Sequence, residues 1–103
     1  MTPGDPSGQP VIIEAAINGQ TPKQLNPNVP RTSQEIAQDA LRCIEAGAAI
    51  VHTHITDIAV PPARAAELYA EHFQPVLEAC PDALLYPTLG FGTSIEDRFA
   101  HIE

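Results

Sequence analysis

The chain has 103 residues, of which 44% are hydrophobic and 17% charged, a composition typical of one small globular domain. Its formal net charge of −8 argues against nucleic acid as a partner, because a polyanion would be repelled. Its apolar runs are shorter than the roughly 18 residues of a membrane span, so we expect no membrane partner. Residues 1–10 lack the basic start and apolar middle of a secretory signal, which predicts a flexible lead-in and a cytoplasmic protein.

Residues 11–103 make up the rest of the chain. Their first half begins with a strand pattern. Val11–Ile17 is β-branched and almost continuously apolar, which predicts a central parallel strand covered on both faces. The segment 18–31 contains three prolines and no periodicity, so we expect a loop. Thr32 and Glu35 have the spacing of a capping box, and the apolar residues after them predict a helix that ends at Gly47.

The second half repeats this alternation. Ala48–His54 predicts a second buried strand, and Pro61-Pro62 can begin a helix that Pro75 should kink or divide. Ala83–Thr88 predicts a third strand, and a second capping box at Thr93 and Glu96 predicts a third helix reaching Glu103. The expected buried side of the second helix comprises Leu68, Tyr69, Phe73, Val76 and Leu77.

This β-α-β-α-β-α order predicts an α/β fold with a parallel sheet and right-handed crossovers. Three such units do not close a barrel, which takes eight units and about 250 residues. We therefore expect the sheet to be incomplete, with two open edges.

Two histidines stand two positions apart in the second strand. The side chains of His52 and His54 should point to the same face, at the carboxyl end where parallel α/β folds build their ligand sites. Two imidazoles in this position can bind one zinc ion. They can also be ordinary histidines that are hydrogen-bonded at a strand end, which is the less favoured alternative.

Two acids accompany this pair. Glu14 lies among apolar residues of the first strand, so its carboxylate must bind a cation, form an ion pair or take up a proton. Asp57 follows His54 by three residues and can either orient an imidazole or cap a turn.

The turn after the third strand contains Thr88, Gly90, Gly92 and Thr93 and precedes a helix start. Backbone amides there can hold a carboxylate or phosphate, although an ordinary βα turn has the same composition. His72 and His101 lie on the predicted second and third helices, where we expect surface positions.

The order of these features resembles that of one enzyme family. The stretches VIIEAAING, NPNVPRT and EAGAAIVHTHITD, with the glycine-containing turn after them, resemble the N-terminal part of the β-keto acid cleavage enzymes. The resemblance covers Val11 to Glu103, and EAGAAIVHTH is its most specific part.

This resemblance implies a (β/α)₈ TIM barrel of which the chain holds the first three βα units. It implies a divalent cation, usually zinc, and acetyl-CoA as co-substrate. Such enzymes convert a β-keto acid, for example 3-keto-5-aminohexanoate, and acetyl-CoA into acetoacetate and a new CoA thioester. The full-length form is expected to be a homo-oligomer.

The resemblance also assigns roles to residues. His52 and His54 match the two histidine ligands, Glu14 the acid that meets a substrate amino group, and residues 88–93 the turn that holds the substrate carboxylate. The family's third ligand, a glutamate, and its substrate-binding arginine come from late strands. Leu89, Phe91 and Thr56 depart from the family pattern, the last standing where an arginine is common.

The leading hypothesis is therefore an incomplete piece of such an enzyme, inactive by itself. Two alternatives remain at this stage. One is another metal-dependent barrel enzyme, a hydrolase or an aldolase. The other is a non-catalytic α/β module that assembles through its open sheet edges.

Overall fold

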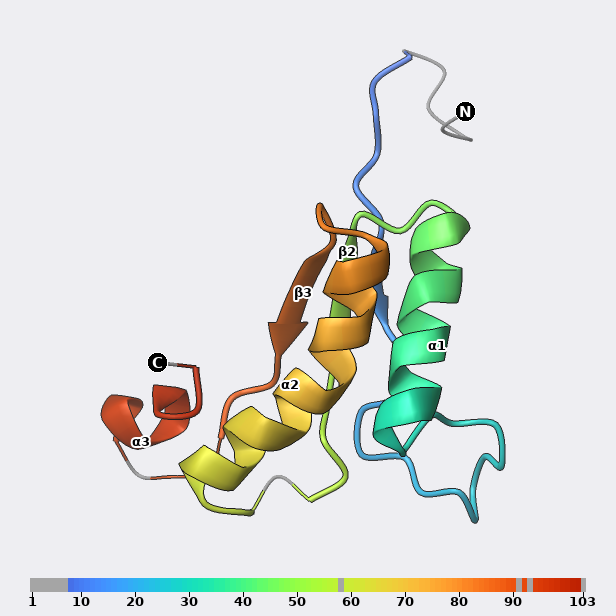
Figure 1. The fold of residues 1–103 in the computed structure, drawn as a ribbon. Coiled ribbons are helices and arrows are strands. Elements are labelled where there is room, and N and C mark those ends of the chain that lie inside the picture. The colour runs from blue at the N-terminus through green and yellow to red at the C-terminus, as the bar shows by residue number, and fades with distance from the viewer. Residues whose placement is uncertain (1–7, 58, 91, 93, 103) are drawn as a thin grey trace.

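The computed structural model describes residues 8–57, 59–90, 92 and 94–102. Three parallel strands form one sheet in the order β1-β2-β3, and a helix follows each strand (Figure 1). The elements are β1 (Glu14–Ala16), α1 (Ser33–Glu45), β2 (Ile50–Thr53), α2 (Pro62–Ala79), β3 (Leu84–Pro87) and α3 (Ile95–Phe99). The predicted α/β class and parallel sheet are confirmed. Among the described residues no helix is both long and apolar enough to cross a membrane.

Helix α1 has the two ends that the sequence predicts. The Thr32 side chain accepts a hydrogen bond from the Glu35 amide at 3.1 Å, and the Glu35 carboxylate accepts one from the Thr32 amide at 3.1 Å. At the other end Gly47 has a φ of 114°, which glycine adopts readily. The Gly47 amide donates to Ile44 and the Ala48 amide to Cys43, so two terminal carbonyl groups are satisfied.

Strand β1 is shorter than predicted. The amides of Ala49 and Ile50 both donate to the Ile13 carbonyl, so the pairing with β2 begins there. Residues before Ile13 have no strand opposite them in the described structure, and Ile12 is 75% exposed. The prediction of a central strand covered on both faces is wrong for this structure, because β1 is an edge strand.

Helix α2 is a single helix, so the division expected at Pro75 does not occur. Pro75 is exposed, and the carbonyl that it leaves without a helical partner can be hydrated. Leu77 was predicted to be buried but is 41% exposed. The buried stripe runs through Ala65, Tyr69, His72 and Val76, which confirms the predictions for Tyr69 and Val76. Leu77 lies about a quarter turn away from this stripe.

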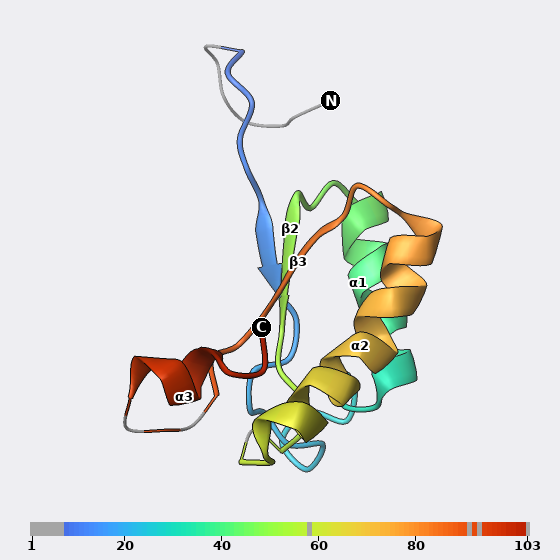
Figure 2. The same cartoon turned by 60° about the vertical axis from the view of Figure 1, so that its left-hand side comes forward.

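The core lies between the sheet and its helices. Both α1 and α2 lie on one side of the sheet (Figure 2). Val51 of β2 is fully buried there against Ala37 and Ala40 of α1 and Val76 of α2. Successive strand residues point to opposite faces, so His52 lies on the side that these helices leave uncovered.

Helix α3 begins one residue later than predicted. Its N-cap is Ser94, whose hydroxyl accepts a hydrogen bond from the Asp97 amide at 3.1 Å. The helix ends at Phe99, so the predicted extension to Glu103 is wrong: residues 100–102 form turns. The predicted cap Thr93 and positions 1–7 of the expected lead-in lie outside the described residues.

Candidate functional site

The two histidines of the second strand lie side by side on the uncovered face of the sheet. Their ring centres are 5.0 Å apart, with an angle of 80° between the ring planes. Both are partly exposed at the carboxyl end of β2. The structure therefore brings His52 and His54 together on one face, as the strand spacing predicts.

A hydrogen bond to the neighbouring strand sets the tautomer of His52. Its Nδ1 lies 3.2 Å from the backbone carbonyl oxygen of Tyr86, and the two rings pack with centres 4.3 Å apart. A carbonyl oxygen only accepts, so Nδ1 carries the proton and the neutral ring keeps its lone pair on Nε2. This is the arrangement that a metal-binding imidazole requires.

His54 has a polar partner from the loop that follows β1. Its Nδ1 lies 3.2 Å from Nε2 of Gln20. A flip of the Gln20 side-chain amide would exchange its nitrogen and oxygen, so that Nδ1 of His54 would face an acceptor instead of a donor. Burial lowers the pKa of His54, and the nearby His52 and Arg31 lower it further. The neutral ring, which is the form that binds metal ions, is thus favoured.

Asn18 holds the backbone of His54, a contact that sequence reasoning missed. Its Oδ1 accepts from the His54 amide at 2.9 Å, and its Nδ2 donates to the His54 carbonyl at 2.9 Å and to the Pro30 carbonyl at 3.2 Å. The sequence shows only an asparagine before Gly19, which is also an ordinary signal for the end of a strand.

Glu14 lies on the same face, and its partner Tyr86 was also missed. The Tyr86 hydroxyl donates a hydrogen bond to the Glu14 carboxylate, and this bond is the main reason why the pKa of Tyr86 is raised. No ion pair of Glu14 occurs among the described residues, so the alternative of a structural ion pair lacks support. The face thus carries a linked set of polar side chains, Glu14, Tyr86, His52 and His54.

Asp57 lies beyond the strand end and forms a turn. Its carboxylate accepts a hydrogen bond from the Ala59 amide at 2.9 Å. This contact favours the turn-capping alternative, and a role in orienting an imidazole stays a prediction.

The turn after β3 is held by hydrogen bonds to residues of α2 and of the C-terminal segment. The Thr88 amide donates to the Tyr69 hydroxyl at 3.2 Å, and the Thr88 carbonyl lies 2.8 Å from Nε2 of His101. The Gly90 amide donates to the Arg98 carbonyl at 2.9 Å. A Cβ atom on Gly92 would lie 2.3 Å from Cβ of Asp97, so only glycine fits there without a shift.

The predicted surface positions of His72 and His101 are wrong. His72 is 1% exposed and lies 2.8 Å, through Nε2, from the Thr53 hydroxyl, while His101 is buried beneath the turn. Both rings pack near Tyr69. Helical periodicity alone did not reveal this, because a histidine can fill a buried position when a strand residue supplies its hydrogen bond.

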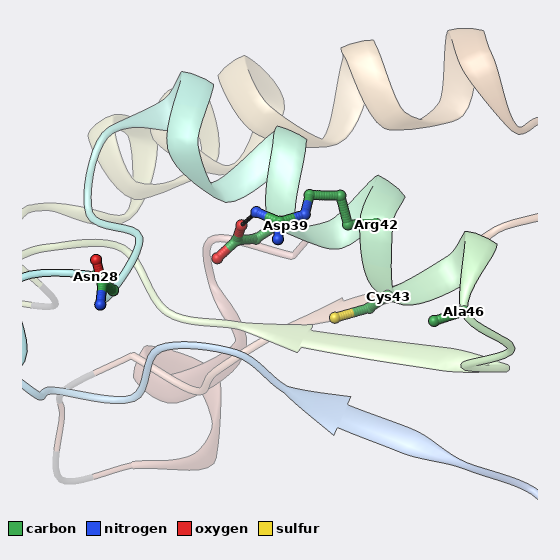
Figure 3. A pocket seen from close by; sticks show the side chains of 5 residues that line it. All are labelled: Asn28, Asp39, Arg42, Cys43 and Ala46. Carbon is green, nitrogen blue, oxygen red and sulfur yellow. Dashed lines mark hydrogen bonds and ion pairs between the residues drawn. The ribbon is translucent and has the colours of Figure 1, made fainter.

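An open groove of about 680 Å³ lies along α1, away from the histidine pair. Figure 3 shows the side chains that line it, among them the ion pair of Asp39 and Arg42 at 3.3 Å. The groove belongs to the helix layer, whereas His52 and His54 lie on the opposite face of the sheet. It therefore adds no residue to the candidate site.

The spacing of the two imidazole rings is compatible with a shared cation. An imidazole that binds zinc at about 2.0–2.1 Å has its ring centre roughly 3 Å from the ion, so two such rings have centres on the order of 5 Å apart. The observed spacing of 5.0 Å agrees with this requirement. The described residues contain no group of three or more His, Cys, Asp or Glu side chains placed to hold a metal ion.

Comparison with known proteins supplies the wider context. A family model described as beta-keto acid cleavage enzyme matches residues 10–103. The 3-keto-5-aminohexanoate cleavage enzyme of Acetoanaerobium sticklandii is 36% identical over 89 residues, which cover 85% of this chain and 33% of the relative. The enzyme of the same name from Fusobacterium nucleatum is 35% identical over 88 residues, covering 84% of this chain and 32% of the relative.

A relative named for another activity is the 3-dehydrocarnitine:acetyl-CoA trimethylamine transferase of Rhizobium meliloti. It is 36% identical over 84 residues, which cover 80% of this chain and 28% of the relative. The chain spans about a third of the length of the curated relatives that it matches. The match over residues 10–103 places the chain in the β-keto acid cleavage enzyme family.

Proposed function

We propose that this chain forms the first three βα units of a (β/α)₈ barrel enzyme that cleaves a β-keto acid with acetyl-CoA as co-substrate. Family membership supports the reaction class, and two relatives carry 3-keto-5-aminohexanoate cleavage in their names. The parallel sheet with α1 and α2 on one side supports the barrel, because the face that these helices leave uncovered corresponds to a barrel interior.

His52 and His54 are the proposed ligands of a divalent cation, with zinc as the preferred ion. The observation that carries this assignment is the pair of rings 5.0 Å apart, one of them held with its Nε2 lone pair available. A bound cation would polarise the keto oxygen and stabilise negative charge on it. Two imidazoles hold zinc weakly, so the proposal requires further ligands, including the glutamate that the family resemblance implies.

Glu14 is the proposed contact for a positively charged substrate group. Its carboxylate is exposed on the same face as the histidines, and the Tyr86 hydroxyl fixes one of its oxygens. A carboxylate with a second oxygen available can accept hydrogen bonds from an ammonium group. The turn at residues 88–93 is proposed to hold the substrate carboxylate, and a homo-oligomer is proposed for the full-length form.

Zinc titration by isothermal calorimetry tests this proposal on the 103-residue chain. We expect His52→Ala and His54→Ala each to abolish measurable binding, since one imidazole remains. His101→Gln is the matched control and should bind zinc like the parent chain. Binding that persists in the double alanine variant would refute the assignment.

The catalytic activity of the chain alone is tested separately. Supplied with zinc, acetyl-CoA and 3-keto-5-aminohexanoate, the chain alone is expected to form no acetoacetate. Turnover that depends on His52 would overturn this expectation and place all essential groups within 103 residues.

A further inference from the structure

The end of the β1–β2 ladder is completed by a side chain. The last backbone bond between the two strands runs from the Ile17 amide to the His52 carbonyl at 3.2 Å. Beyond it the chain turns away from β2 at Gly19, which has a φ of 53°. The next ladder position on β2 belongs to His54, whose backbone needs a donor and an acceptor.

Asn18 supplies both groups. Its amide oxygen accepts from the His54 amide and its amide nitrogen donates to the His54 carbonyl, each at 2.9 Å. A side-chain amide carries the same donor and acceptor as a peptide group, so it can act as a strand neighbour for one residue. Asn18 is 5% exposed, and water therefore competes little for these bonds.

The third bond of Asn18 joins this contact to the loop 18–31. Its Nδ2 also donates to the carbonyl of Pro30, which is buried at the far end of that loop. The residue thus fixes the His54 backbone against two segments, and the position of that backbone decides where the His54 ring lies relative to His52.

We infer that Asn18 is a positioning residue for the metal ligand His54. The inference rests on the proposed function, since it concerns the geometry of the proposed cation site. Groups that hold metal ligands in place usually change affinity by 10- to 100-fold when they are removed. Asn18 would act through the backbone of the ligand and not through its ring.

Two substitutions test the inference. Asn18→Ala removes all three hydrogen bonds. Asn18→Asp keeps the shape and the acceptor but places a carboxylate oxygen against the carbonyl groups of His54 and Pro30. We expect each variant to bind Zn²⁺ on the order of tenfold more weakly than the parent chain in calorimetry.

Thr56→Val is the matched control. The Thr56 hydroxyl donates a hydrogen bond to the Arg31 carbonyl at 2.9 Å, so the substitution also loosens the loop 18–31. Thr56 lies two residues after His54, and this hydrogen bond does not involve the His54 backbone. Zinc affinity should be unchanged in this variant. An equal loss in Thr56→Val and Asn18→Ala would overturn the inference, because general loosening of the loop would then explain both.

A metal-free measurement separates this inference from the proposed function. In nitrogen-15 NMR spectra of the imidazoles, both Asn18 variants should shift the His54 signals and leave those of His101 in place. Unchanged His54 signals would refute the role of Asn18, even if zinc binds. Shifted His54 signals in a chain that binds no zinc would leave Asn18 as the positioning residue of His54 and show that His52 and His54 do not hold the ion without further ligands. Far-ultraviolet circular dichroism identifies folded variants, and either substitution alone suffices if the other does not fold.

Discussion

Tyr86 contacts His52 in two ways across the β2–β3 pair. Its backbone carbonyl oxygen accepts the Nδ1 hydrogen of the imidazole at 3.2 Å, and its ring packs against the imidazole ring with centres 4.3 Å apart. The first contact sets the tautomer, and the second limits rotation of the ring. Only the second depends on the Tyr86 side chain, so the two can be separated by mutation.

Substitutions of Tyr86 should therefore differ in their effect on zinc. Tyr86→Phe keeps the ring and the carbonyl, so we expect zinc affinity to be unchanged. Tyr86→Ala removes the ring packing, and a few-fold loss is expected because the His52 ring gains freedom. Calorimetric titration of both variants measures the difference. An equal loss in the two would mean that the hydroxyl bond to Glu14, and not the ring, orients the site.

The core position Val51 should dominate the stability of the sheet–helix layer. Val51→Ala leaves a cavity among Ala37, Ala40 and Val76, and we expect the free energy of unfolding to fall by roughly 2 kcal/mol. Val11→Ala is the matched control, because Val11 is exposed, and should change it by less than about 0.5 kcal/mol. Urea denaturation measures both. Similar losses would show that the packing of β2 against the helices is not the main support of the fold.

The capping box of α1 should contribute about 1 kcal/mol to the free energy of unfolding. Thr32→Ala removes the acceptor of the Glu35 amide, and losses near this value are usual for an N-cap threonine. Thr21→Ala, at an exposed position in the preceding loop, serves as the control. It should change the free energy of unfolding by less than about 0.5 kcal/mol. Urea denaturation distinguishes the two. A neutral Thr32→Ala would mean that packing alone maintains the start of the helix.

Buried His72 should make stability depend on pH. Burial lowers the pKa of His72 to about 4, although the Leu68 carbonyl and the Glu71 carboxylate oppose this shift. The unfolded chain takes up this proton near the ordinary histidine pKa of about 6.5. Because the unfolded state binds more protons between these values, stability is full above about pH 6.5 and falls toward pH 4, by an amount on the order of 3 kcal/mol.

A neutral replacement isolates this effect. His72→Gln retains a polar group near Thr53 but has no proton to gain, so the fall in unfolding free energy between pH 6.5 and pH 4 should be smaller. Glu35, whose pKa is lowered to about 2 chiefly by the Arg31 amide, loses its contribution only as the pH falls from about 4.5 toward 2. The two groups therefore act in different ranges. Parallel pH profiles for the parent and His72→Gln would contradict the prediction.

Local patterns in the sequence were sufficient to predict several features of the structure. The capping box of Thr32 and the terminal Gly47 involve residues three or four positions apart, so their spacing predicts the contact. The alternation of strand side chains likewise placed His52 and His54 on one face. The family resemblance was confirmed by the match over residues 10–103.

Contacts between distant segments were not predictable in this way. Asn18 meets His54 across 36 positions and Tyr86 meets Glu14 across 72, and no local pattern encodes either pairing. The burial of His72 also depends on a distant partner, the Thr53 hydroxyl. The same limit explains the error at β1, because the number of strands beside it is a property of the whole sheet.

The two outer strands have a practical consequence for handling the chain. In the described part of the molecule β1 and β3 each pair with β2 alone, so their outer backbone groups can accept a further strand. Electrostatic repulsion from the net charge of −8 opposes contact between copies, and salt weakens that repulsion. Dilute, low-salt buffers should therefore keep preparations monomeric, whereas concentration at high ionic strength should promote polymerisation through the sheet.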